Sequence, residues 1–234
     1  MPSLSGHTCP TDRPCPWSTT LRAIECLLLF GVFPVLVDLK TQSRLLIPFL
    51  VVCAIGIFIY LMTSKDFDRR KLINLDGFKR ELPRILITWV LGALSLIAVV
   101  WWLDQQPGTP EQVTLFGFPL RNPKFWAIIC VLYPIFSVYP QELILRTFFF
   151  HRYRFVFRTP AMMIFFNGLA FAWVHIMFRN APAVLLCIPA GFLFAYTYWK
   201  SKSTIASGLE HAMFGDWMWT VGLGYYFYGG SLRG

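Results

Sequence analysis

The stretch VYPQELILRTFFFH, residues 138–151, decides how the rest of the chain is interpreted. It places a carboxylate, an amide and a guanidinium inside a segment that otherwise has the composition of a membrane-spanning helix. Glu142 and Arg146 are four residues apart, so at ~3.6 residues per turn they lie on nearly the same face, whereas Gln141 points about 100° away. Ionisable side chains within a membrane are costly and usually face a bundle interior or a wet cavity. The stretch therefore predicts a functional site inside the membrane.

The composition of the chain indicates that its solvent is largely lipid. Of its 234 residues, 56% are hydrophobic, 18% are aromatic and only 14% are charged. Soluble domains carry about 25% charged residues, and repeated apolar runs of ~18 to 20 residues are membrane spans. We therefore expect an all-α, polytopic membrane protein with membrane lipids as partners. The net charge of +9 does not predict a nucleic-acid partner, because the basic residues lie between the apolar segments and act there as a topology signal.

Three regions follow from the spacing of the apolar runs. Residues 1–19 predict an irregular tail, in which Cys9 and Cys15 alone specify neither a disulfide nor a metal site. Residues 20–122 predict a three-helix scaffold, and residues 123–234 predict a four-helix core that holds the chemistry. The seven predicted spans are 21–37, 45–62, 85–103, 125–150, 161–178, 183–199 and 204–228.

The distribution of Lys and Arg predicts the orientation of the bundle. Most of them fall on the side that holds the N-terminus, which predicts a cytoplasmic N-terminus and, as location, the inner (cytoplasmic) membrane of a bacterium. The loop 63–84 would then be cytoplasmic, either as a basic amphipathic piece on anionic headgroups or as a solvated loop. In the first span, Arg22 and Glu25 are three residues apart and predict a local pair at the interface.

Two types of site fit the polar residues of the last four spans. FAWVH places Phe171 and His175 one turn apart, and EHAMFGD begins with Glu210 and His211. In one type, Glu142 is general base for a water whose attack on a carbonyl is assisted by His175 and His211. In the other, these three side chains bind a divalent ion such as zinc, although no HExxH spacing is present. The first type requires no cofactor and is our first expectation.

A simpler interpretation needs no chemistry at all. Glu142 and Arg146 neutralise each other in it, and each histidine is a hydrogen-bonded packing residue. Depth along the helices leaves convergence open: Glu142 and His211 lie about 13 Å and 10 Å below the same surface, but His175 lies about 22 Å along its helix, roughly two turns too far.

The order QELILR, FAWVH and EHAMFGD, each at a membrane helix, resembles the CPBP (ABI) family of intramembrane peptidases, which includes the type II CAAX prenyl proteases. The family motifs are EExxxR, FxxxH and HxxxN or HxxxD, and the resemblance covers residues 125–228. It implies an all-helical fold with a membrane-embedded site open to the cytoplasm. It also implies hydrolysis of a peptide bond near the membrane end of a substrate, by a glutamate-activated water with the histidines polarising the carbonyl or holding a metal.

The first motif departs from the family pattern at its first position. Aligning Arg146 with the motif's arginine places Gln141 at the first glutamate, which the family uses as general base, and Glu142 at the second. Glutamine cannot take a proton from water. The chain resembles a bacterial branch with this variant form, in which Glu142 takes over as base, Glu210 does so beside His211, or the protein is a non-hydrolysing relative.

The third motif departs at its last position. His211 is present, but Gly215 stands where Asn or Asp is expected, and Asp216 follows one residue later. The candidate catalytic residues are thus Glu142, His175, His211, Arg146 and Gln141, with Glu210, Asp216 and Phe171 as accessory candidates.

Three functional hypotheses from different classes follow. The first is an intramembrane endopeptidase acting on a membrane-associated protein or peptide. The second is a catalytically silent membrane binding or regulatory protein, suggested by Gln141. The third is a proton-coupled transporter, suggested by buried Glu, His and Arg but not supported by an inverted repeat between the halves.

Overall fold

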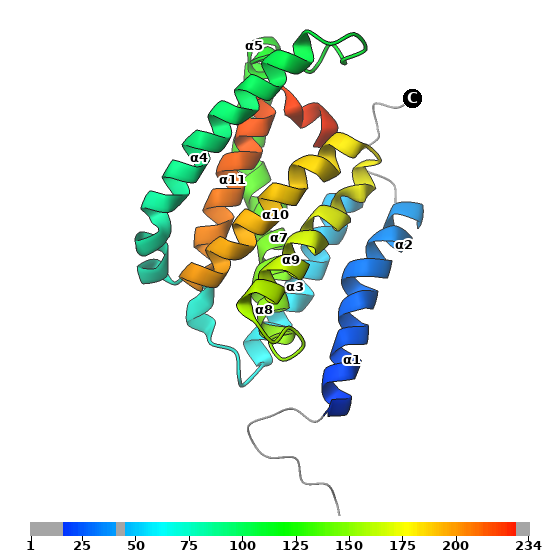
Figure 1. The fold of residues 1–234 in the computed structure, drawn as a ribbon, viewed down its shortest axis with the longest axis vertical. Helices are drawn as coiled ribbons and strands as arrows, with labels where there is room; N and C mark the ends of the chain where they lie inside the picture. The colour runs from blue at the N-terminus through cyan, green and yellow to red at the C-terminus, as the bar shows by residue number, and fades with distance from the viewer. Residues whose placement is uncertain (1–15, 41–44, 228–234) are drawn as a thin grey trace, which may run out of the picture.

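The computed structural model describes residues 16–40 and 45–227, and the regular secondary structure of this part is entirely helical (Figure 1). Helical residues make up 84% of it and it contains no strand, which confirms the predicted fold class. Cys9, Cys15 and most of the predicted tail lie outside the described residues. The first helix begins at Pro16, so the last residues of the predicted tail are helical.

Most of the helical elements follow one another with short connections, and the longest connection of the described part is residues 105–116 between the helices Leu75–Asp104 and Gly117–Arg121. In chain order they are α1 (Pro16–Leu27), the π-helical η1 (Leu28–Val32), α2 (Phe33–Lys40), α3 (Leu46–Thr63), the 3-10 turn η3 (Arg69–Leu72), α4 (Leu75–Asp104), α5 (Gly117–Arg121), α6 (Pro123–Tyr133), the π-helical η4 (Pro134–Val138), α7 (Tyr139–Glu142), the π-helical η5 (Leu143–Phe148), α8 (Phe149–Arg152), α9 (Pro160–Val174), the 3-10 turn η6 (His175–Phe178), α10 (Ala181–Ser201), α11 (Thr204–Val221) and the 3-10 turn η7 (Leu223–Phe227).

Six helical stretches of the described part are long and apolar enough to cross a membrane, so the chain is an integral membrane protein. Each of them overlaps one of the first six predicted spans. They are Ser18–Val37, Leu46–Thr63, Arg69–Asp104, Pro123–Arg152, Pro160–Phe178 and Ala181–Ser201.

The seventh predicted span is helix α11, which is not among those six and lies inside the bundle. It packs against α4, α6 and α10, as its position beside α4 and α10 in Figure 1 shows. Two indoles fix it to α4: Trp89 donates to the Met213 carbonyl and Trp217 to the Ala93 carbonyl, both at 3.1 Å. The helix ends at Gly222, whose φ of +103° is the left-handed conformation that favours glycine at a helix C-terminus.

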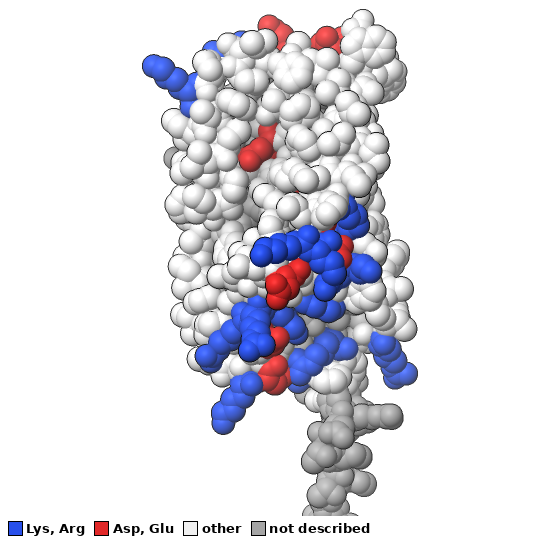
Figure 2. Space-filling view, turned by 90° about the vertical axis from the view of Figure 1, so that its left-hand side faces the viewer, with Lys and Arg blue, Asp and Glu red and all other residues white. Residues whose placement is uncertain are grey.

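The predicted loop 63–84 is mostly not a loop. Helix α4 already begins at Leu75, where the Asn74 side chain accepts a hydrogen bond from the Gly77 N–H at 3.1 Å and caps the helix. Asn74 also donates to the Ser201 carbonyl at 2.9 Å, which joins the start of α4 to the end of α10. Figure 2 shows Lys and Arg side chains gathered at this end of the bundle, as the topology signal predicts.

In the first span, Arg22 acts on Glu25 through its charge, but the closer partner of Glu25 lies elsewhere in the chain. Glu25 instead pairs with Arg152 at the end of α8, where Arg152 donates two hydrogen bonds of 2.9 Å and 2.6 Å to its carboxylate. The Tyr153 hydroxyl also donates to Glu25, at 3.1 Å. A partner 127 residues away cannot be deduced from local spacing, and it fixes the N-terminal helix to the core.

Helices α9 and α10 cross closely because both carry a glycine at the crossing point. A Cβ added at Gly191 would lie 2.5 Å from the Gly168 carbonyl oxygen and 3.1 Å from the Phe171 Cβ. The approach brings Phe171 of α9 against Phe194 of α10, with ring centroids 5.7 Å apart. This contact builds one wall of the site described next.

Candidate functional site

The helix that carries the first motif is not a regular α-helix. Two π-helical segments, Pro134–Val138 and Leu143–Phe148, flank the single α-helical turn Tyr139–Glu142. Bonding of i to i+5 instead of i to i+4 changes the angular phase of the side chains, and such segments are frequent at functional sites. The helix is therefore irregular on both sides of the turn that contains Pro140, and the phase of the two wide segments decides where Gln141 and Glu142 point.

Glu142 points into the bundle towards His211. Its Oε1 lies 3.0 Å from the His211 Nδ1 and its Oε2 lies 3.7 Å from the Arg146 Nε. A carboxylate only accepts, so His211 must donate the Nδ1 hydrogen, and in the neutral ring Nε2 is then an acceptor. The Glu142 and Arg146 side chains are 0% exposed. Glu142 thus holds one orientation and one tautomer of His211 and at the same time neutralises Arg146.

Arg146 is held by partners on two further elements. Its Nη1 donates to the Asn167 Oδ1 on α9 at 2.7 Å, and Asn167 in turn donates to the Leu145 carbonyl. The guanidinium carbon lies 4.8 Å from the Phe171 ring centroid, within cation–π range. One carboxylate, one amide and one aromatic face therefore compensate part of the cost of burying this charge, while Nε and Nη2 have no hydrogen-bond partner in the described structure.

Both histidine rings line a single cavity of about 310 Å³ between α4, α6, α9, α10 and α11. The Phe171 ring lies between them, 4.6 Å from the His175 centroid and 5.2 Å from that of His211. Phe194 stacks on His211 at 4.7 Å and 19°. The predicted excess depth of His175 does not separate the two histidines, because both reach this cavity.

His175 is oriented by the backbone of its own helix. Its Nδ1 lies 2.6 Å from the Phe171 carbonyl oxygen, and since a carbonyl only accepts, Nδ1 carries the hydrogen. In the neutral ring Nε2 is therefore an acceptor, as it is in His211. Hydrolysis needs an acceptor for the proton of an attacking water, and the cavity offers two.

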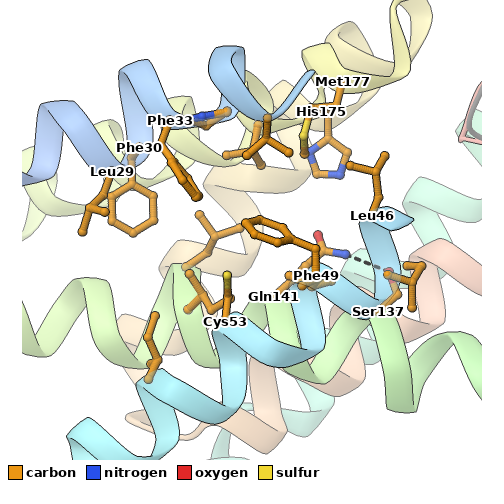
Figure 3. A pocket seen from close by; sticks show the side chains of 18 of the residues that line it. Leu29, Phe30, Phe33, Leu46, Phe49, Cys53, Ser137, Gln141, His175 and Met177 are labelled. Atoms are coloured by element: carbon orange, nitrogen blue, oxygen red, sulfur yellow. Dashed lines mark hydrogen bonds between the residues drawn. The ribbon is translucent and has the colours of Figure 1, made fainter. Parts of the chain in front are cut away.

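Gln141 points to a different space. With Ser137 and His175 it lines a mostly apolar pocket of about 500 Å³, whose other walls come mainly from η1, α2, α3, η5 and η6 (Figure 3). The Gln141 amide donates to the Ser137 hydroxyl at 2.9 Å, the bond drawn in Figure 3. His175 lines this pocket and the 310 Å³ cavity, whereas Glu142 lines neither of them.

The two accessory acids lie outside this arrangement. Glu210 is 0% exposed and faces α4 and α10, where its carboxylate accepts from Thr88 at 3.1 Å and from Thr197 and pairs with the Arg84 Nη1 at 3.5 Å. Asp216 does not line the cavity that holds His211. One of its carboxylate oxygens is buried without a hydrogen-bond partner in the described structure.

Sequence reasoning missed Tyr133, the last residue of α6. Its hydroxyl lies 3.4 Å from the His211 Nε2, and its ring lines the same cavity. The available signal was Gly215: a position without a side chain, one turn after His211, leaves room for a large residue from a neighbouring helix.

A metal ion does not fit these side chains as they are arranged. Within residues 16–40 and 45–227, no three His, Cys, Asp or Glu side chains are grouped so that they could hold one. The Nδ1 atoms of His175 and His211 are bonded to a carbonyl and a carboxylate, and that carboxylate also faces Arg146. We therefore derive no step through a metal.

Residues 123–215 match the family model described as type II CAAX prenyl endopeptidase Rce1-like. The matched segment runs from the first residue of α6 to Gly215 and contains Tyr133, Gln141, Glu142, Arg146, His175 and His211. It confirms the family resemblance that the three motifs predict. No curated protein and no solved structure matches the chain.

Proposed function

We propose that this chain, whose residues 123–215 belong to the Rce1-like family of type II CAAX prenyl endopeptidases, is an intramembrane endopeptidase. Its substrate is a membrane-associated protein or peptide cut near its membrane end. The observation that carries the proposal is the hydrogen bond between Glu142 and His211, together with the cavity that His211 shares with His175. The family match favours hydrolysis over proton-coupled transport.

In this proposal the general base is His211. Glu142 was the candidate base from sequence, but its side chain is 0% exposed and one oxygen already accepts from His211. A carboxylate that holds Nδ1–H leaves Nε2 free to take a proton and stabilises the imidazolium that forms. Nε2 of His211 takes one proton of a water in the cavity, while Nε2 of His175 accepts a hydrogen bond from the other. The water oxygen then attacks the carbonyl carbon, and His211 returns the proton to the leaving amine.

The charge distribution supports an orientation for this enzyme. The end of the bundle with gathered Lys and Arg faces the cytoplasm, which also gives a cytoplasmic N-terminus in a bacterial inner membrane. Substrates would then be membrane-anchored chains whose scissile bond approaches the cavity from within the bilayer or from its cytoplasmic face.

A catalytically silent binding protein is the second candidate. Gln141 favours it, because a glutamine cannot act as the proton acceptor at this position. Its amide is instead hydrogen-bonded to Ser137 and lines an apolar pocket. A protein of this kind would retain the pocket and bind a membrane-embedded segment without cutting it. The two candidates differ in one observable property, the release of peptide products.

The test uses purified protein in phospholipid vesicles with single-span reporter peptides. The reporters carry randomised residues around the membrane interface, with and without a prenylated C-terminal cysteine, and mass spectrometry identifies the products. We expect cleavage by the wild type and none by His211→Gln. The matched control is His151→Gln, since His151 lies outside the cavity and 3.7 Å from Asp66. Cleavage by His211→Gln at the wild-type rate would contradict the proposal.

A further inference from the structure

Gly215 and Tyr133 occupy one space between them. A Cβ added at Gly215 would lie 2.5 Å from the Tyr133 hydroxyl oxygen and closer still to its ring. Gly215 follows His211 by four residues on α11, so any side chain at 215 would project on the same helix face as that histidine. The phenol of Tyr133, coming from α6, thus fills the position that a residue at 215 would otherwise take.

The cavity also needs a hydrogen-bond donor that its histidines do not provide. Attack on a peptide carbonyl places negative charge on the carbonyl oxygen, and donors aimed at this oxygen are usually the largest single contribution to catalysis. Both histidines already donate from Nδ1 to protein groups, His175 to the Phe171 carbonyl and His211 to Glu142, so that in the neutral form each has only its Nε2 acceptor left for a ligand.

The other hydroxyls that line the cavity have short-range acceptors of their own. Ser95 donates to the Leu91 carbonyl at 2.8 Å, and the Thr88 hydroxyl lies 3.0 Å from the Arg84 carbonyl and 3.1 Å from Glu210. Among the residues that the structure describes, the Tyr133 hydroxyl has only a long contact of 3.4 Å, to the His211 Nε2. A contact of this length is weaker than the ~2.7 Å typical of O–H donors, so this hydrogen is the one most easily given to a ligand.

We propose that Tyr133 is a catalytic residue whose phenolic O–H donates a hydrogen bond to the carbonyl oxygen of the scissile peptide, in the place left empty by Gly215. The inference rests on the proposed function. As the water oxygen bonds to the carbonyl carbon, the π-electron pair moves to the carbonyl oxygen, and the proton of the water goes to the His211 Nε2. Tyr133 turns its O–H from Nε2 to that oxygen and keeps its proton. The C–N bond then breaks, and His211 protonates the amine.

Tyr133→Phe tests the hydroxyl alone, because the ring remains and packing is preserved. We expect kcat for the reporter peptides to fall about 100-fold, the usual effect of removing one such donor, with KM little changed. The matched control is Tyr139→Phe, since Tyr139 lies in the adjacent turn, is 39% exposed and does not line the cavity. It should cleave at the wild-type rate.

An exchange of the two positions distinguishes donation from packing. Gly215→Asn alone should lose activity because its Cβ collides with Tyr133. Tyr133→Ala combined with Gly215→Asn should cleave at least tenfold faster than Tyr133→Ala alone, because the new amide can donate from the other helix into the same space. Failure of this rescue would overturn the assignment.

The same assay separates this inference from the proposed function. If Tyr133→Phe cleaves within threefold of the wild type while His211→Gln is inactive, the assignment of Tyr133 is wrong and the peptidase proposal stands. If the wild type does not cleave, or His211→Gln cleaves as well as the wild type, both are overturned.

Discussion

Replacing Glu142 by glutamine tests whether this carboxylate supports His211 as base. The Glu142 Oε1 lies 3.0 Å from the His211 Nδ1, and both side chains are buried. With charge centres ~4 Å apart and an effective dielectric constant of about 20, the carboxylate attracts an imidazolium by about 4 kcal/mol. Since about 1.36 kcal/mol corresponds to a factor of ten in rate, Glu142→Gln should lower kcat by ~10³-fold. Cleavage of the reporter peptides with the folded variant in vesicles measures this directly.

The same substitution has a structural cost that must be separated from its effect on catalysis. Arg146 is 0% exposed and would lose the carboxylate with which it forms an ion pair, and breaking a buried ion pair in this way costs about 3–5 kcal/mol. Combining Glu142→Gln with Arg146→Met removes the unpaired charge and should restore much of the thermal stability. Activity should stay low in the double variant. The support of His211 by Glu142 is contradicted if Glu142→Gln cleaves at the wild-type rate, or if the double variant regains activity together with stability.

Three further predictions concern the scaffold around the site. Gly191→Ala should lower the free energy of unfolding by about 1–3 kcal/mol because its Cβ meets a carbonyl of α9, whereas Gly56→Ala, which has open space, should change it little; thermal unfolding in detergent compares them. Glu210→Gln should lower stability by about 1–3 kcal/mol without changing kcat, and a loss of kcat in fully folded protein would return Glu210 to the list of bases. The Arg154 guanidinium donates to Asp66 and holds the pKa of that carboxyl below its usual 3.8. The stability that this ion pair contributes is therefore fully present above pH 3.8 and is lost as the pH falls through the lowered pKa. Asp66→Asn should therefore destabilise the protein by less than about 1 kcal/mol at neutral pH and not at all in strong acid, because Asp66 is largely exposed; equal destabilisation at both pH values would contradict this.

The helices could be predicted from the sequence because apolar runs of membrane length have few other interpretations. Six of the seven predicted spans coincide with helices apolar enough to cross a membrane. Helix α11 was also predicted, although its apolar residues are interrupted by Glu210, His211 and Asp216. It differs from the other six because neighbouring helices enclose it and accommodate these polar groups. The start of α4 was missed, since a basic segment with a helix cap looks like a loop when only hydropathy is considered.

The side-chain partners in the site could be predicted only where they are local. Glu142 and Arg146 are one turn apart, and their pairing follows from helix geometry. Which of Gln141 and Glu142 faces His211 depends on two π-helical segments, and no residue pattern in a single sequence specifies their phase. The bond between Glu142 and His211 joins residues 69 positions apart, so it required the tertiary structure.

The role of Tyr133 could not be predicted from its own position in the chain. Tyr133 lies inside the predicted span 125–150, where a single aromatic residue is ordinarily a packing residue. Only the contact between its ring and Gly215 shows that the two positions share one volume beside His211. The third motif has no side chain at Gly215, and the Tyr133 hydroxyl from another helix occupies that space.

The central claim is that this site hydrolyses peptides although Gln141 occupies the position of a glutamate. The most direct measurement compares the wild type with Gln141→Glu on the same reporter peptides, with product release followed by mass spectrometry. We expect the wild type to cleave already, because His211 and Glu142 supply the base. No products from the wild type and clear cleavage by Gln141→Glu would contradict it and identify the natural protein as a catalytically silent relative.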